Sequence, residues 1–262
     1  NDQPIVSPQA DSASEFTVIV VYTSAFATAA GNVSAYMDLL ELETNTSYAN
    51  SGVNTSVKIV HSYQTNYTDS NNFFTDMDYF LNGANLYAAE LYALRDQHKA
   101  DLMILLTGNG YSFCGLASGI GVNEDEAFAV ASETCAVGYY SFGHEIGHLF
   151  GARHIITQDP TSTPFSYGHG YCNTTASTWR TVMAYNCPSS TGGPRIQQWS
   201  NPNVSIGEDP TGSVALEHNA RVHNERAGDV ANFRTEDDDS SIQDDFLLML
   251  VPNIISAGNQ KK

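Results

Sequence analysis

The sequence predicts an α/β (α+β) fold with a mixed, mostly parallel sheet. Stretches of buried-strand length alternate with helical periodicity between residues 16 and 106, the pattern of a parallel sheet covered by helices. One of these strands is continuously apolar, as expected where both faces of a strand are covered. After about residue 151 the periodicity disappears. We therefore expect an upper lobe at about 15–151 and an irregular lower lobe at about 152–234.

The upper lobe is assigned element by element. A β-branched run predicts a strand at its start, and Gly52 marks the end of the first helix because glycine favours helix C-termini. The short run at 102–106 is the fully apolar one. The expected elements are a strand at 16–22, a helix at 25–49, a strand at 57–63, a helix at 86–97, a strand at 102–106 and a fourth, edge strand at 127–131.

The remaining segments have less regular patterns. Residues 157–217 are rich in Gly, Pro, Ser, Thr and Asn and predict an irregular lobe. Spaced apolar residues then predict a last helix at 218–233. Residues 1–14 are polar and contain proline, which predicts a flexible lead-in that follows a processing cut. The acidic composition of residues 235–262 predicts a linker or tail.

Composition narrows the class of protein. A hydrophobic fraction of 42% with 15% charged residues is typical of a folded globular chain. The 29 acidic and 11 basic residues give a net charge of −18, which argues against nucleic acid and anionic membranes as partners. No apolar run reaches the ~20 residues of a membrane span. We expect a monomer, with calcium binding by some carboxylates as a secondary possibility.

Four cysteines allow three pairings into two disulfides: Cys114, Cys135, Cys172 and Cys187. The pairing Cys114–Cys135 with Cys172–Cys187 is favoured because each bond closes a short local loop. Such a bond stabilises a fold by roughly 3 kcal/mol in the chain-entropy model. A cysteine-ligated zinc is the alternative, but the chain has no CxxC pair. Disulfides predict a secreted, extracellular protein.

The segment from Gly143 to His154 carries the chemistry. On a helix, His144 and His148 lie one turn apart on one face, so both imidazoles can reach one metal ion. Gly151 can take a positive φ and turn the chain back, which returns His154 as a third ligand. Three imidazoles and an open position predict one catalytic zinc ion. The alternative, an ordinary core helix, explains neither Gly151 nor His154.

Glu145 lies beside the histidine pair without being needed as a ligand. Zinc lowers the pKa of a bound water and polarises a carbonyl group. Glu145 would take the proton of that water and later deliver it to the leaving amine. The extended motif is more specific than a bare HExxH.

A second segment resembles the Met-turn of the metzincin peptidases. Met183 lies 29 residues after His154, within Thr181 to Tyr185. The resemblance implies a metzincin-type fold, with Met183 as an apolar floor beneath the metal and Tyr185 close to the zinc or the tetrahedral intermediate. It also implies that an edge strand pairs with substrate, for which we expect residues 127–130, although these could equally form an interior strand.

More of the chain is similar to the bacterial peptidyl-Asp metalloendopeptidases. This resemblance spans roughly residues 16–234 and implies cleavage on the N-terminal side of aspartate. Ile155 departs from the acidic residue that follows the third histidine in the astacin-like and reprolysin-like subgroups. The matching stretches are 20–23, 48–54, 93–96, 114–117, 138–145, 179–185, 199–204 and 219–221.

An aspartate-preferring enzyme needs a cation to pair with the substrate carboxylate. The architecture of the clan places this position near the segment after the Met-turn. Arg195, twelve residues after Met183, is therefore the first candidate, with Arg180 and Arg153 behind it. The alternative for Arg195 is a surface or interlobe salt bridge.

The sequence thus predicts a secreted zinc endopeptidase that acts on protein or peptide substrates. Three other hypotheses stay open. They are a metzincin of broad specificity with an apolar primed-side pocket, a non-catalytic binding module of the same fold, and a zinc hydrolase that acts on other compounds. The presence of Glu145 disfavours the binding module, and the Met-turn disfavours the last.

Overall fold

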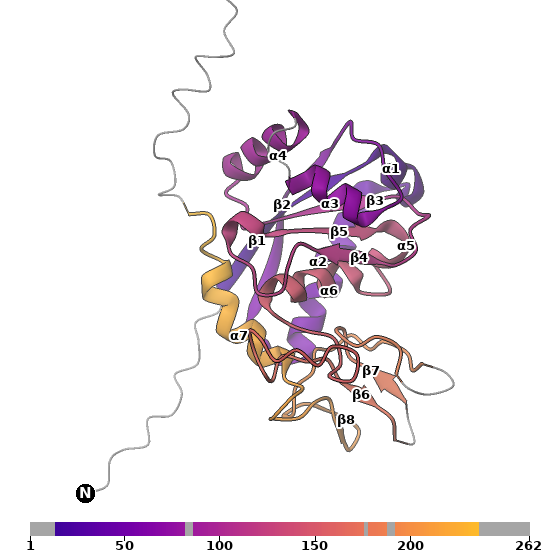
Figure 1. Cartoon of the computed structure of the whole chain (residues 1–262), viewed down its shortest axis with the longest axis vertical. Helices are drawn as coiled ribbons and strands as arrows, with labels where there is room; N and C mark the ends of the chain where they lie inside the picture. Colours follow the sequence, from indigo (N-terminus) through magenta and orange to yellow (C-terminus); the bar gives the residue numbers. More distant parts are fainter. Residues whose placement is uncertain (1–13, 82–85, 176–177, 188–191, 236–262) are drawn as a thin grey trace, which may run out of the picture.

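The fold is described from a computed structural model of the chain (Figure 1), which describes residues 14–81, 86–175, 178–187 and 192–235. The predicted lead-in, apart from its last residue, and the predicted acidic tail, apart from its first, lie outside these residues. A sheet with helices on both faces forms the upper part of Figure 1. An irregular segment with short strands lies below it.

The predicted mixed, mostly parallel sheet is confirmed. Its strand order is β2-β1-β3-β5-β4, formed by β1 (Ser14–Tyr22), β2 (Thr55–Gln64), β3 (Leu102–Thr107), β4 (Gly115–Ala117) and β5 (Phe128–Ser132). The β2–β1, β1–β3 and β3–β5 pairs are parallel, and the β5–β4 pair is antiparallel. For residues 127–131 the edge strand is wrong, and the alternative left open for 127–130, an interior strand, is the one observed. β5 lies between β3 and β4, and the short β4, which periodicity did not reveal, forms the edge instead.

Alternate residues of the central strands enter two separate cores. In β3, Leu102, Ile104 and Leu106 face one core, and Met103 and Leu105 face the other. The first core is covered by α2 (Val33–Asn50), α6 (Ser141–Phe150) and α7 (Asn219–Val230), and the second by α3 (Phe73–Leu81) and α4 (Leu86–Gln97). All six residues of β3 are buried, so its continuous apolar sequence reflects cover on both faces.

Two helical predictions need correction. The single helix expected at 25–49 is two helices, α1 (Ser24–Ala30) and α2, because Gly31 adopts a φ of 68° that ends the first. The side chain of Asn32 then accepts a hydrogen bond from the Ala35 N–H and caps the second. A further helix, α3, was not predicted, although its buried residues Phe73, Met77 and Phe80 have helical spacing.

The lower segment contains short strand pairs rather than a second sheet. The antiparallel pairs are β6 (Cys172–Asn173) with β7 (Trp179–Arg180), and β8 (Ser205–Ile206) with β9 (Asp209–Pro210). The disulfides Cys114–Cys135 and Cys172–Cys187 confirm the predicted pairing. A short helix, α5 (Glu133–Ala136), contains Cys135 and precedes α6.

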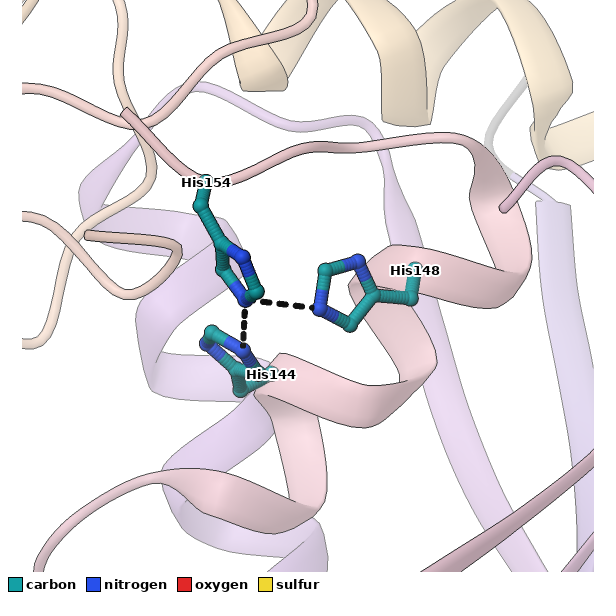
Figure 2. A group of neighbouring side chains, drawn as sticks. All are labelled: His144, His148 and His154. Carbon is teal, nitrogen blue, oxygen red and sulfur yellow. Dashed lines mark hydrogen bonds between the residues drawn. The ribbon is translucent and has the colours of Figure 1, made fainter. Parts of the chain in front are cut away.

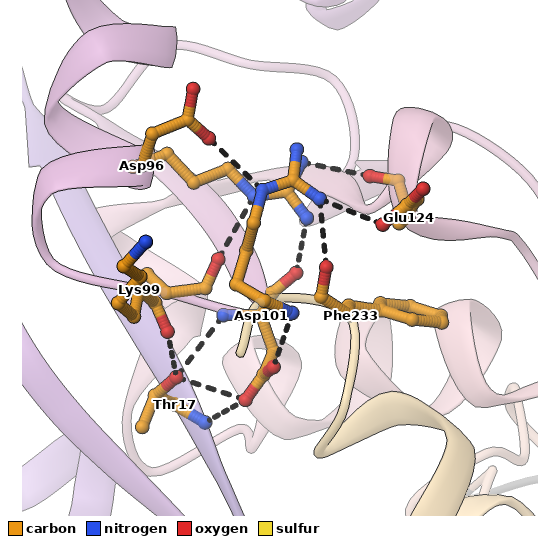
Figure 3. A network of polar contacts seen from close by, with 9 residues as sticks. Thr17, Asp96, Lys99, Asp101, Glu124 and Phe233 are labelled. Carbon is orange, nitrogen blue, oxygen red and sulfur yellow. Dashed lines mark hydrogen bonds and ion pairs between the residues drawn. The ribbon is translucent and has the colours of Figure 1, made fainter. Parts of the chain in front are cut away.

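A polar network fixes the end of α7 to the sheet (Figure 3). The Asp101 carboxylate accepts hydrogen bonds from the Thr17 N–H at 2.7 Å, the Thr17 hydroxyl at 2.9 Å and the Arg234 N–H at 3.2 Å. The Arg234 guanidinium forms ion pairs of 3.0 Å with Asp96 and with Glu124. These contacts join the starts of β1 and β3 to the segment after the last helix. Within the described residues, no helix combines the length and apolarity that a membrane span requires.

His223 on α7 makes the free energy of unfolding depend on pH. The side chain is fully buried against Tyr48, Phe150 and Trp199. Neither of its ring nitrogens has a hydrogen-bond partner among the described residues. Burial lowers the pKa of His223 to about 3. The unfolded chain, with an ordinary histidine pKa near 6.5, binds this proton first.

The stability from a neutral His223 is therefore full above pH 6.5 and is lost as the pH falls from 6.5 towards 3. Between pH 7 and pH 5 we expect the free energy of unfolding of the native chain to fall by about 2 kcal/mol more than that of His223→Phe. Urea unfolding of both proteins at the two pH values measures this difference. The contributions of the zinc-site histidines to this pH dependence are the same in both proteins and cancel in the comparison. An equal decrease would show that the pKa of His223 in the fold is close to its ordinary value, so that its burial does not oppose protonation.

Candidate metal centre

The helix α6 is buried along its entire length. All ten residues from Ser141 to Phe150 are buried. The helix begins after Tyr140 and ends at Gly151, and both residues have a left-handed backbone, with φ of 59° and 114°. The Gly151 N–H donates to the carbonyl groups of Gly147 and His148, which closes the last turn. The chain then reverses and leads to His154.

Three histidine side chains converge beside this helix (Figure 2). The Nε2 atom of His154 lies 3.1 Å from Nε2 of His144 and 3.0 Å from Nε2 of His148. Within the described residues, these three form the one group of three or more His, Cys, Asp or Glu side chains close enough to share an ion. No comparable group of carboxylates occurs there, so calcium binding stays a prediction.

The hydrogen bonds of two imidazoles indicate a shared cation. Nδ1 of His144 lies 2.8 Å from the Val182 carbonyl oxygen, and Nδ1 of His148 lies 2.9 Å from that of Ala152. A carbonyl only accepts, so both Nδ1 atoms carry the proton and both Nε2 atoms present a lone pair. His154 can donate one proton to one of them at most. A cation held by all three nitrogens removes the remaining repulsion between Nε2 lone pairs. Three imidazoles with an open position fit a catalytic zinc ion.

The electrostatic environment keeps the three imidazoles neutral. Burial is the main cause in each case, and the neighbouring histidines add to it for His144 and His154. The pKa of His144 lies well below its ordinary value, that of His148 falls to about 4 and that of His154 to about 3. Neutral imidazole is the form that binds a metal. The site therefore presents its ligands without first having to lose protons at neutral pH.

Glu145 lies on the same helix and faces the edge strand. Its side chain is 4% exposed, and burial raises the pKa of its carboxyl group to about 8. The Arg195 charge and the Ala117 N–H act in the opposite direction and favour the carboxylate. A Cβ atom at Gly115 would lie 2.5 Å from Glu145 Oε1. Only glycine at the start of β4 allows the carboxyl group to occupy this position.

The segment from Thr181 to Tyr185 packs against α6 and the His154 ring. Met183 is fully buried, and a Cβ atom at Gly147 would lie 2.7 Å from its Sδ and 2.7 Å from Cζ3 of Trp199. Glycine at this position lets α6 approach both side chains. The Tyr185 ring lies over the His154 ring, with centroids 3.8 Å apart, and is 46% exposed.

The three candidate arginines occupy different environments. Arg153 forms an ion pair of 2.8 Å with Asp159, so its charge is already neutralised. Arg180 is 3% exposed, and its Nη2 donates to the Tyr139 hydroxyl at 2.6 Å. Arg195 is partly exposed and donates to the carbonyl groups of Tyr139 and Ala184 at 2.8 and 3.3 Å. Neither Arg180 nor Arg195 forms an ion pair with a described carboxylate.

Sequence reasoning did not assign a role to several residues of this centre. One of them, Gly147, lies within the histidine motif itself. The others lie in stretches that were noted only for their resemblance to the family: Gly115, Tyr139 and Trp199. Their contacts join segments far apart in sequence, and no local spacing signals them. The glycine between the two histidines was the one available local signal, since a helix interior disfavours glycine unless close packing requires it.

Comparison with known families decides the classification. The sequence model of metallopeptidase family M12 matches residues 12–200, which include the three histidines, Glu145 and Met183. The chain belongs to metallopeptidase family M12. The resemblance to peptidyl-Asp metalloendopeptidases is also confirmed, by relatives of that name.

Two bacterial relatives are reported. A peptidyl-Asp metalloendopeptidase of Stenotrophomonas maltophilia (strain R551-3) is 41% identical over 239 residues, which cover 89% of this M12 chain and 57% of the relative. One of Pseudomonas fragi is 37% identical over 169 residues, 64% of this chain and 89% of the relative. The chain spans little more than half the length of the longer relatives.

A solved structure described as a chaperone-substrate complex shares the fold of the M12 chain. The two superpose with a TM-score of 0.68 over 86% of this chain and 36% of the other, at 15% sequence identity. This likeness concerns the fold alone.

Metal binding gives the first test of this centre. We expect the chelator-treated M12 chain to take up one zinc ion and its Tm to rise by roughly 5–10 °C at a hundredfold excess over the Kd. His148→Ala should lose both effects, because two imidazoles cannot complete the site. His98→Ala, which removes a histidine that stacks on His61 away from the triad, is the matched control. Equal zinc uptake by native protein and His148→Ala, measured by equilibrium dialysis, would contradict the assignment.

Proposed function

We propose that this chain is a zinc-dependent endopeptidase that hydrolyses peptide bonds on the N-terminal side of aspartate. The observation that carries the proposal is the convergence of three Nε2 atoms next to a buried carboxyl group, with those of His144 and His148 3.1 and 3.0 Å from that of His154. An M12 family match and relatives named peptidyl-Asp metalloendopeptidases support it. The residues that would hold zinc are His144, His148 and His154.

Zinc held there would polarise the peptide carbonyl and acidify a water molecule. With zinc bound, Glu145 would accept the proton of the attacking water as the water oxygen bonds to the carbonyl carbon. The same carboxyl group then donates the proton to the amine nitrogen as the C–N bond breaks. A pKa raised by burial suits a group that must both take and return a proton. Tyr185 is half exposed and lies beside His154, which supports a role as hydrogen-bond donor to the carbonyl oxygen that becomes negative.

An extended substrate would lie along β4. This strand is the edge of the sheet, and its Gly115 and Ala117 contact Glu145. Backbone hydrogen bonds to such an edge hold a peptide independently of its sequence. Substrate pairing is therefore assigned to residues 115–117, in place of the 127–130 expected from the sequence.

Arg195 is the residue proposed to select aspartate. Its charge lowers the pKa of Glu145, His144 and His154, which supports a place for the guanidinium close to the metal centre. Its guanidinium has two carbonyl partners and no carboxylate among the described residues. A substrate carboxylate would neutralise this partly buried cation. The same observation disfavours an apolar pocket and hence a protease of broad specificity.

The two disulfides support a location outside the cytosol. A net charge of −18 suits a freely soluble, monomeric enzyme that acts on proteins or peptides. Detection of the mature chain in culture medium rather than in cell lysate tests this part of the proposal.

Replacement of Glu145 by Gln tests the chemistry. We expect kcat/KM on an aspartate-containing peptide to fall by at least about a hundredfold, because the proton acceptor is lost. Zinc stoichiometry should stay at one, since Glu145 is not a ligand. Glu90→Gln, which removes a surface carboxylate that accepts from Tyr63, is the control. Activity retained in Glu145→Gln would assign the proton transfer to another group.

Replacement of Arg195 by Ala tests the specificity. Two peptides that differ only in Asp or Ala after the scissile bond are compared. The ratio of their kcat/KM values should fall by at least about thirtyfold, which corresponds to about 2 kcal/mol for loss of a charged partner. Arg221→Ala removes an arginine paired with Glu225 on the surface and should leave the ratio unchanged. An equal loss on both peptides would mean that Arg195 supports the fold rather than selecting substrate.

A further inference from the structure

The loop Gly138–Tyr140 that leads into α6 is held firmly from two sides. Both carboxylate oxygens of Glu43, on α2, accept from the Gly138 N–H at 3.0 and 2.9 Å. On the other side, Tyr140 adopts its left-handed backbone directly before the helix. A non-glycine residue in this conformation needs support from its surroundings. Tyr139, between these two fixed points, therefore has little freedom to move.

Tyr139 contacts both unpaired arginines near the metal centre. The guanidinium carbons of Arg195 and Arg180 lie 4.7 and 5.4 Å from the centroid of its ring. Its carbonyl oxygen accepts from Arg195 Nη1 at 2.8 Å, and its hydroxyl oxygen accepts from Arg180 Nη2 at 2.6 Å. One residue thus provides a ring face and two oxygen acceptors to two cations.

The two arginines are also neighbours through their backbones. The Arg180 N–H donates to the Pro194 carbonyl at 3.0 Å, and the Ile196 N–H donates to the Arg180 carbonyl at 2.8 Å. Two guanidinium groups held together in a partly buried site repel each other. The negative face of an aromatic ring attracts cations and offsets this repulsion. Because Arg180 is almost completely buried, only Arg195 is left to receive a substrate carboxylate.

We infer that Tyr139 is a positioning residue for substrate selection, which holds the Arg195 guanidinium, with Arg180 behind it, where the carboxylate of the residue after the cut is bound. The inference rests on the function proposed above. Arg180, expected from the sequence as a substrate-binding residue, acts through the Tyr139 hydroxyl and does not touch the substrate. A guanidinium fixed in advance binds a carboxylate with less loss of side-chain entropy than a mobile one.

The test compares kcat/KM for the aspartate and alanine peptides in Tyr139 variants. We expect Tyr139→Phe to lower the Asp/Ala ratio about fivefold, because it removes the acceptor of Arg180 Nη2 and leaves the Arg180 side chain, within the described residues, only its bond from Nη1 to the Asn186 side chain. Tyr139→Leu, which also removes the ring, should lower it about tenfold or more. Tyr63→Phe removes a tyrosine hydroxyl from the far side of the sheet and should leave the ratio unchanged. Zinc content and Tm are measured for each variant, and Tyr139→Phe serves alone if the leucine variant does not fold.

A double-mutant cycle separates positioning from a general structural role. If Tyr139 acts through Arg195, Tyr139→Phe should change the ratio by less than twofold once Arg195 is alanine. Independent losses that multiply in the double variant would overturn the inference, as would an unchanged ratio in both Tyr139 variants of an enzyme that prefers aspartate. A native chain without aspartate preference would instead overturn the specificity proposed for Arg195 itself.

Discussion

The close approach of the fully buried helix α6 to its surroundings is the constraint on which the rest of the structure depends. Gly147 leaves no space for a Cβ atom between the helix and the Met183 and Trp199 side chains, and Gly115 leaves none between β4 and Glu145. Protein interiors are packed densely enough that one added methyl group must displace a neighbour. The positions of the metal ligands and of the carboxyl group therefore follow from packing on opposite sides of one helix.

Charge is distributed very unevenly around this helix. The chain as a whole carries −18, yet Arg195, whose charge acts on the metal centre, has no carboxylate partner in the described structure. Burial keeps the histidines neutral and keeps the Glu145 proton affinity high, while Arg195 opposes protonation of His144, His154 and Glu145. A negatively charged surface around a locally positive site also disfavours nonspecific binding of anions and leaves recognition to short-range contacts.

The parts of the site come from segments that are distant in sequence but directly linked. The Val182 carbonyl accepts from the His144 ring and fixes its orientation. Arg195 donates to the carbonyl of Ala184, which follows Met183, and to that of Tyr139, which precedes α6. The Cys114–Cys135 disulfide joins the residue before the edge strand to the short helix that precedes the Tyr139 loop. Because these links join the lower segment, the edge strand and the start of α6, the three histidines, β4 and Arg195 are expected to respond together to changes in the lower segment.

The sequence by itself determined the features that local spacing encodes. The helical repeat brought His144 and His148 to one face, the apolar run at 102–106 specified a doubly covered strand, and short loops specified both disulfides. Only the tertiary structure decided that 128–132 lies inside the sheet, that 115–117 is the edge, and that Arg180 donates a hydrogen bond to the Tyr139 hydroxyl. These outcomes depend on contacts between residues tens of positions apart. Periodicity reports which face of an element is buried, but not which distant element covers it.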